Sequence, residues 1–107
     1  MLDELEFRRA AGTALDSLMR HLIVREEAAA AGFEVEEQNG LVNVEFEEPP
    51  GKFVITPNAP MRQIWISALS TSFKLDWDEG ASAFLLPRTG EQLAPLVDRL
   101  IEEHLAG

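Results

Sequence analysis

Residues 33 to 46 read Phe-Glu-Val-Glu-Glu-Gln-Asn-Gly-Leu-Val-Asn-Val-Glu-Phe, with apolar and polar side chains alternating on both sides of Asn39-Gly40. An Asn-Gly pair between alternating runs predicts a β-hairpin with a two-residue turn, because both central residues of that turn need positive φ. Counting outward from Gln38 and Leu41 pairs Glu36 with Asn43, Val35 with Val44, Glu34 with Glu45 and Phe33 with Phe46. One face of the hairpin is then apolar (Phe33, Val35, Val42, Val44, Phe46), and the other is polar (Glu34, Glu36, Asn43, Glu45).

The segment before the hairpin is expected to be helical. Between Leu5 and Val24 apolar residues recur every three or four positions, which indicates one buried stripe of an amphipathic helix. The stripe comprises Phe7, Ala11, Leu15, Leu18 and Leu22, widened by Ala14, Met19 and Ile23. We expect the helix to fray through residues 28–31 and to stop at Gly32, a residue suited to a left-handed cap.

The segments after the hairpin favour short strands and a second helix. Alternating runs at 52–56, 61–69, 73–78 and 81–86 are separated by turn-forming residues at 48–51, 57–60 and 70–72. Thr89 and Gln92 fit a helix capping box before apolar residues at helical spacing, although Pro95 should delay the regular helix. We therefore expect an α+β fold in a single domain over residues 1–107. It is a two-layer α/β sandwich whose N- and C-terminal helices pack on one face of a five- to six-stranded antiparallel sheet.

Composition excludes several classes of protein. The chain of 107 residues has 19 acidic and 9 basic residues, a net charge of −10, and no cysteine. Nucleic-acid binding is not expected, because it needs a basic surface, and disulfides and thiolate metal sites are impossible. No long apolar run or signal segment is present, so we expect a soluble cytoplasmic protein, or a processed organellar form, without a membrane partner.

The negative charge is concentrated around the predicted hairpin. Eight glutamates and no Lys or Arg lie between Glu26 and Gly51, so we expect no base to offset the Glu34–Glu45 pair. Clustered carboxylates suit hard cations, and residue type alone leaves calcium, magnesium, manganese and ferrous iron open. Such a block is equally typical of a merely solvated surface. We find no nucleophile motif, phosphate-binding glycine loop or His-rich metal spacing, and His21 and His104 lie on separate helices.

Trp65 is the second candidate feature. Alternation in residues 61–69 places Ile64 and Ile66 on one face and Gln63, Trp65 and Ser67 on the other. A strand tryptophan usually belongs to the core. If this one is exposed among polar neighbours on an open sheet face, it is a candidate anchor for a protein partner.

The stretch Pro60-Met61-Arg62-Gln63-Ile64-Trp65-Ile66-Ser67 resembles the signature strand of the frataxin family, Pro-x-x-Gln-(Ile/Val)-Trp-(Leu/Ile). Residues 14–18, 53–55, 74–77 and 89–91 also resemble frataxin segments, so the similarity runs from about Glu6 to Glu103. The order of elements in that family agrees with the order derived above.

The resemblance, which includes the bacterial CyaY type, implies a non-enzymatic iron donor or regulator in iron–sulfur cluster assembly. It implies weak surface binding of Fe²⁺ and Fe³⁺ and, as partners, the cysteine desulfurase and the scaffold protein; we expect a monomer. The candidate metal ligands are Asp16, Glu26, Glu27, Glu34, Glu36 and Glu45. The candidate partner-binding residues are Arg62, Gln63, Trp65, Ser67 and Lys74, and no catalytic residue is expected.

The sequence leaves two alternative functions open. One is ferroxidase and iron-storage activity, against which the lack of a Glu-x-x-His motif argues. The other is a metal-independent acidic interaction module. The chain also departs from the family in its first helix, where Arg20 and Arg25 stand in a region that often carries acids in frataxins, so cation affinity there should be lower.

Overall fold

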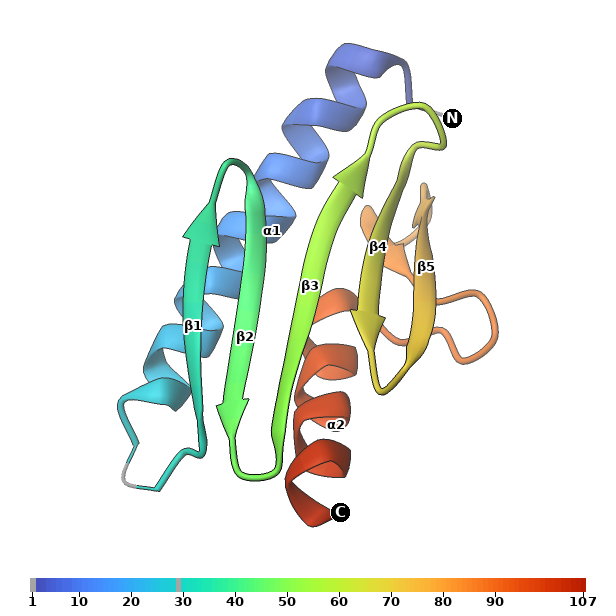
Figure 1. Ribbon diagram of the computed structural model, residues 1–107. Helices are drawn as coiled ribbons and strands as arrows, with labels where there is room; N and C mark the ends of the chain where they lie inside the picture. The colour runs from blue at the N-terminus through green and yellow to red at the C-terminus, as the bar shows by residue number, and fades with distance from the viewer. Residues whose placement is uncertain (1, 29) are drawn as a thin grey trace.

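Six strands in chain order form one antiparallel sheet, and two helices cover one of its faces (Figure 1). The computed structural model describes residues 2–28 and 30–107. The elements are α1 (Glu4–Glu26), β1 (Phe33–Gln38), β2 (Leu41–Glu47), β3 (Pro50–Asn58), β4 (Gln63–Ala68), β5 (Thr71–Asp78), β6 (Ala83–Leu85) and α2 (Leu93–Ala106). The predicted α+β sandwich is confirmed. The sheet face away from the helices is called the open face below.

The β1–β2 hairpin forms in the predicted register, with Glu34 opposite Glu45 and Phe33 opposite Phe46. Asn39 and Gly40 form the turn with φ of 53° and 84°. The apolar face turns toward the helices, where Val42 and Val44 are fully buried and Val35 is half-buried. Asn43 projects from the open face as predicted, yet it is buried there.

Helix α1 follows its predicted stripe but ends differently. Asp3 and Glu6 form a capping box, each side chain accepting a hydrogen bond from the other's backbone N–H. Phe7, Ala11, Leu15, Leu18 and Leu22 are buried, whereas Ile23 is exposed and does not widen the stripe. The prediction that Gly32 caps the helix is wrong, because α1 ends at Glu26. Gly32 has a φ of 83° and leads into β1, packed against the side chain of Leu105.

Strand bounds differ from the predictions by one or two residues, with β3 and β5 longer and β4 and β6 shorter than expected. β3 begins at Pro50 and extends to Asn58. Pro57 lies beyond the last residue pair that β3 makes with β2, so its missing N–H removes no hydrogen bond between these two strands. The β4–β5 turn is Leu69-Ser70, both with positive φ, rather than residues 70–72. Positive φ at Arg62 and Ser82 delays the starts of β4 and β6.

Helix α2 begins at Leu93, and the predicted capping box of Thr89 with Gln92 does not form. Pro95 is the third helical residue, where its missing N–H would have no partner within the helix. Near its end, the ring of His104 contacts Phe46 at 4.0 Å between centroids, and Nε2 lies 2.7 Å from the carbonyl oxygen of Pro49. Within the described residues, neither helix is long and apolar enough to cross a membrane.

The helices are joined by a cluster of polar contacts centred on Asp98, and Arg25 of α1 also lies 4.0 Å from Glu102 of α2. The carboxylate of Asp98 on α2 lies 2.7 Å from Nε2 of His21 on α1 and also accepts a hydrogen bond from Arg25. These side chains are only partly exposed, at 30% to 40%. The contact therefore fixes the C-terminal half of α1 beside α2, behind the β1–β2 hairpin (Figure 1).

Candidate functional site: an acidic hairpin and an open sheet face

The candidate metal ligands on α1 occupy separate places. Glu26 is half-buried, and its Oε2 accepts a hydrogen bond of 2.6 Å from the backbone N–H of Val35 in β1. Glu27 is the exposed C-terminal cap residue of α1. Asp16 is exposed ten residues before Glu26, about 15 Å along the helix axis at 1.5 Å per residue. The structure thus brings Glu26 to the β1 edge and leaves Asp16 away from it.

The hairpin ligands lie on the open face. Glu34 and Glu45 face each other across the β1–β2 ladder, and Glu36 lies opposite the buried Asn43. The expectation that no base offsets the Glu34–Glu45 pair needs correction, because Lys52 is the β3 partner of Glu45 and its Nζ lies 4.0 Å from Oε1. Lys52 directly follows Gly51, the end of the segment that lacks Lys and Arg.

A hollow of about 410 Å³ lies at the end of the hairpin where Phe33 pairs with Phe46. Its lining includes Glu34 and Glu45 together with Glu47 and Glu48, which the sequence reasoning did not select. Continuing the predicted alternation from Glu45 would have placed Glu47 on the same face. These carboxylates are exposed and can stay hydrated, so they offer a cation oxygen ligands without a fixed coordination geometry.

Within the described residues, no group of three or more His, Asp or Glu side chains is arranged to hold a metal ion. The six candidate ligands therefore do not form a closed site. The arrangement can attract cations and basic surfaces through its charge, and can supply two carboxylates at a time, as Glu34 and Glu45 do.

Trp65 on β4 is held in place by a chain of hydrogen bonds on the open face. Its Nε1 donates to Oε1 of Gln63 over 2.7 Å, and Nε2 of Gln63 donates to Oδ1 of Asp76 over 2.8 Å. The Nζ of Lys74 lies 4.7 Å from the centre of the Trp65 ring, a cation–π contact. Trp65 is half-buried, so part of the indole stays accessible while its orientation is fixed.

The remaining partner candidates divide into two groups. Ser67 is exposed on the open face and pairs with Val54 and Ser72. Arg62 precedes β4 with a φ of 54°, and its guanidinium donates to the backbone carbonyls of Ala59 and Leu2. The structure therefore brings Gln63, Ser67 and Lys74 around Trp65 and directs Arg62 elsewhere.

Asp76 is the residue of this group that sequence reasoning missed. The predicted alternation already set Asp76 on the outward side of β5, but its contact with Gln63 depends on the β4–β5 register. The group presents an aromatic ring between a carboxylate and an ammonium, which suits the binding of a protein surface.

The sequence is similar to a known protein family and to several named proteins. Residues 1–107 match the frataxin-like domain family. The chain is similar to the iron-sulfur cluster assembly protein CyaY of Stutzerimonas stutzeri, at 30% identity over 70 residues that cover 65% of this chain and 63% of that protein. It is 30% identical to CyaY of Cupriavidus pinatubonensis over 92 residues, covering 86% of this chain and 80% of that protein.

The backbone agrees with a solved structure as well. A frataxin from Psychromonas ingrahamii superposes with a TM-score of 0.73 at 21% sequence identity, covering 96% of this chain and 91% of that one. Its similarity supports the fold. The match to the Stutzerimonas protein spans less than two thirds of that relative's length. From the match over its whole length, together with the sheet and helix arrangement, this chain belongs to the frataxin-like domain family.

Proposed function

We propose that this protein is a non-enzymatic, monomeric, cytoplasmic iron-binding adaptor in iron–sulfur cluster assembly. The relatives' names support the process, since the CyaY proteins are described as iron-sulfur cluster assembly proteins. The proposed partners are a cysteine desulfurase and a scaffold protein. The proposed cargo is Fe²⁺ or Fe³⁺, held weakly at the carboxylates of the β1–β2 hairpin.

The observation that carries this proposal is that one sheet face bears both candidate sites. Paired residues share a face, so the row of Glu36, Asn43, Val54 and Ser67 leads from the acidic hairpin to the strand of Trp65. Three strand spacings separate Glu36 from Ser67, about 14 Å. A partner burying about 800 Å² of this protein would cover both ends of the row at once.

An anaerobic titration with Fe²⁺, followed by NMR of the backbone amides with and without the desulfurase, tests the proposal. We expect broadening at residues 34–36 and 45–48, and its reduction in a Glu34→Gln, Glu45→Gln double variant. A Glu4→Gln, Glu6→Gln variant changes the same charge at the far end of α1 and should leave the titration unchanged. If the hairpin amides did not respond, the iron-donor role would be wrong.

A metal-independent interaction module is the second candidate, favoured by the lack of a three-ligand group among the described residues. In that case Trp65→Ala abolishes desulfurase binding, salt weakens the binding, and iron changes neither. A ferroxidase would instead show iron-dependent oxygen consumption that falls in the Glu34→Gln, Glu45→Gln variant. The parent protein, the Glu34→Gln, Glu45→Gln variant and the Trp65→Ala variant together distinguish the iron donor, the metal-independent module and the ferroxidase.

A further inference from the structure

The outer edge of β5 is only half covered by a neighbouring strand. β6 pairs with β5 at residues 76–78 and no further toward the β4–β5 turn. After Leu85 the chain turns away from β5, because Pro87 has no N–H to donate and the N–H of Leu86 donates to the carbonyl oxygen of Glu91. In Figure 1 this loop swings out beyond β5. Residues 71–75 are thus left as a sheet edge.

The hairpin geometry indicates which backbone groups this edge presents. In a two-residue turn the flanking residues, here Ala68 and Thr71, exchange hydrogen bonds, and the next pair does not. The N–H and C=O groups of Ser72 and Lys74 therefore point outward. The same alternation, counted from the Asn39-Gly40 turn, directs the backbone N–H and C=O of Val35 away from β2. The N–H of Val35 indeed donates to the side chain of Glu26. The β1 edge is capped there by a side chain, whereas β6 stops short of Ser72 and Lys74.

A groove of about 630 Å³ lies along this edge, between residues 71–74 and the loop at 86–89, with Arg99 of α2 beside them. Its described lining combines apolar side chains (Phe73, Leu86, Pro87) with hydroxyls and three bases (Lys74, Arg88, Arg99), and includes no acidic residue. These three bases lie in the lining of a groove on a chain whose net charge is −10.

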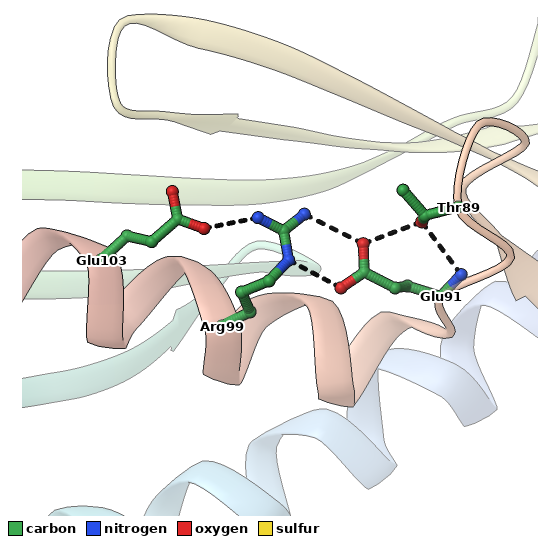
Figure 2. Close-up of polar contacts among 4 residues, drawn as sticks. All are labelled: Thr89, Glu91, Arg99 and Glu103. Atoms are coloured by element: carbon green, nitrogen blue, oxygen red, sulfur yellow. Dashed lines mark hydrogen bonds and ion pairs between the residues drawn. The ribbon is translucent and has the colours of Figure 1, made fainter.

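The loop side of the groove is ordered by polar contacts. Figure 2 shows Arg99 donating to both carboxylate oxygens of Glu91, at 2.7 and 2.9 Å, and to Glu103. The Thr89 hydroxyl donates to Glu91 over 2.8 Å and accepts from its backbone N–H. Arg99 is paired with two carboxylates, which offset its charge. Lys74 contacts the Trp65 ring, a cation–π contact that leaves its charge in place, so Lys74 and Arg88 supply the positive charge of the groove.

We propose that this groove binds an extended, acidic segment of a partner protein as an added β-strand. The segment's backbone pairs with Ser72 and Lys74, its apolar side chains contact Phe73 and Leu86, and its carboxylates lie near Lys74 and Arg88. Charge favours an acidic strand over a basic one, and the short open edge favours four or five residues. The site lies on a sheet edge and does not depend on the iron role proposed above.

The probe is a capped hexapeptide of alternating Glu and Val, titrated into the full-length ¹⁵N-labelled protein. We expect amide shifts at residues 71–74 and 86–88, and slowed hydrogen exchange at the amides of Ser72 and Lys74. The same peptide with Lys in place of Glu should bind at least about tenfold more weakly, since both groove cations would then repel it. Shifts confined to the β1–β2 hairpin or to Trp65 would overturn the proposal.

Two matched pairs of variants sharpen the test. Ser72→Pro removes the outward N–H at an edge position that tolerates proline, and should weaken peptide binding about tenfold, whereas Ser72→Thr keeps that N–H and the affinity. Arg88→Glu should weaken binding about fivefold, whereas Arg8→Glu, the same charge change on α1, should not. Equal affinities within both pairs would refute strand addition, and the Arg88 pair decides the matter if Ser72→Pro fails to fold.

Discussion

Replacing Gly51 by alanine tests how the end of α2 packs on the sheet. Gly51 is the second residue of β3, and a Cβ built on it would lie 2.5 Å from Cε1 and 3.1 Å from Nε2 of His104. A shift of the imidazole would disturb two other contacts, because Nε2 lies 2.7 Å from the Pro49 carbonyl oxygen and the ring lies 4.0 Å from Phe46 between centroids. The substitution must therefore displace a ring that is hydrogen-bonded and packed.

The expected loss follows from three contributions. Overpacking of this kind costs about 1–3 kcal/mol, and loss of the hydrogen bond to Pro49 costs about 1 kcal/mol. Gly51 does not have positive φ, so alanine itself is unstrained and returns about 0.4–1 kcal/mol by restricting the unfolded chain. The net loss in the free energy of unfolding is about 2 kcal/mol, which lowers Tm by about 10 °C in a domain of this size.

Urea unfolding of Gly51→Ala, His104→Ala and the double variant measures the coupling directly. With the ring removed, Gly51→Ala should cost nothing or stabilise slightly. Gly12→Ala is the matched control: no neighbouring atom lies within 4 Å of its added Cβ in α1, so it should stabilise the protein by about 1 kcal/mol. An equal cost of Gly51→Ala with and without His104 would refute this account of the contact.

Three further substitutions probe other contacts. Hydrogen bonds from Arg99 and then Thr89 lower the pKa of Glu91, so its carboxylate stabilises the fold above pH about 4.5 and that stability is lost as pH falls. Glu91→Gln should cost about 1 kcal/mol at pH 7, and the cost should shrink progressively as pH falls below about 4.5, measured by urea unfolding. Asp98→Asn weakens the contact between the helices and should cost about 1 kcal/mol at pH 7, by the same assay. Leu22→Ala empties a fully buried position and should cost about 2–5 kcal/mol, measured by thermal unfolding.

The Glu91 and Leu22 substitutions each have a matched control. Glu4→Gln removes an exposed carboxylate paired with Arg8 and should cost no more than about 0.5 kcal/mol over the same pH range. A Glu91→Gln deficit that did not shrink as pH fell would show that its carboxylate charge is not the cause. Val24 is 70% exposed, so Val24→Ala should be nearly neutral. Comparable losses for Leu22→Ala and Val24→Ala, or an Asp98→Asn variant as stable as the parent, would contradict the packing described.

The β1–β2 hairpin could be predicted residue by residue, because two independent signals agree there. The Asn39-Gly40 pair specifies the turn, and the alternation specifies which side chains are buried, so a slip by one residue would expose every apolar side chain of the strand. The β4–β5 turn lacked such a signal. Its positive φ falls on Leu69 and Ser70, residue types that rarely adopt it, whereas the Ser70-Thr71-Ser72 run looked more like a turn.

Contacts between elements could not be predicted, since they depend on registers and packing that no short segment specifies. Lys52 partly offsets Glu45 only because β2 and β3 pair as they do. His104 looked like a polar residue on a surface helix, but α2 brings its ring onto Phe46. Gln63 was selected for its place beside Trp65, yet its second contact, with Asp76, required the β4–β5 register.

The spacing of the carboxylates limits how the acidic hairpin can bind a cation. Alternation predicts that Glu34, Glu36 and Glu45 share a face, but successive residues on one face of a strand are about 7 Å apart. That spacing is too wide for one small cation to bind all of them directly at the 2.3–2.6 Å typical of calcium or at shorter iron–oxygen distances. A cation bridging Glu34 and Glu45 keeps most of its coordination positions for water. On the proposed function, a partner that covers the open face can supply the missing ligands, so iron should bind more tightly to the complex than to the protein alone. Equal iron affinity of the free and the desulfurase-bound protein would rule out this coupling.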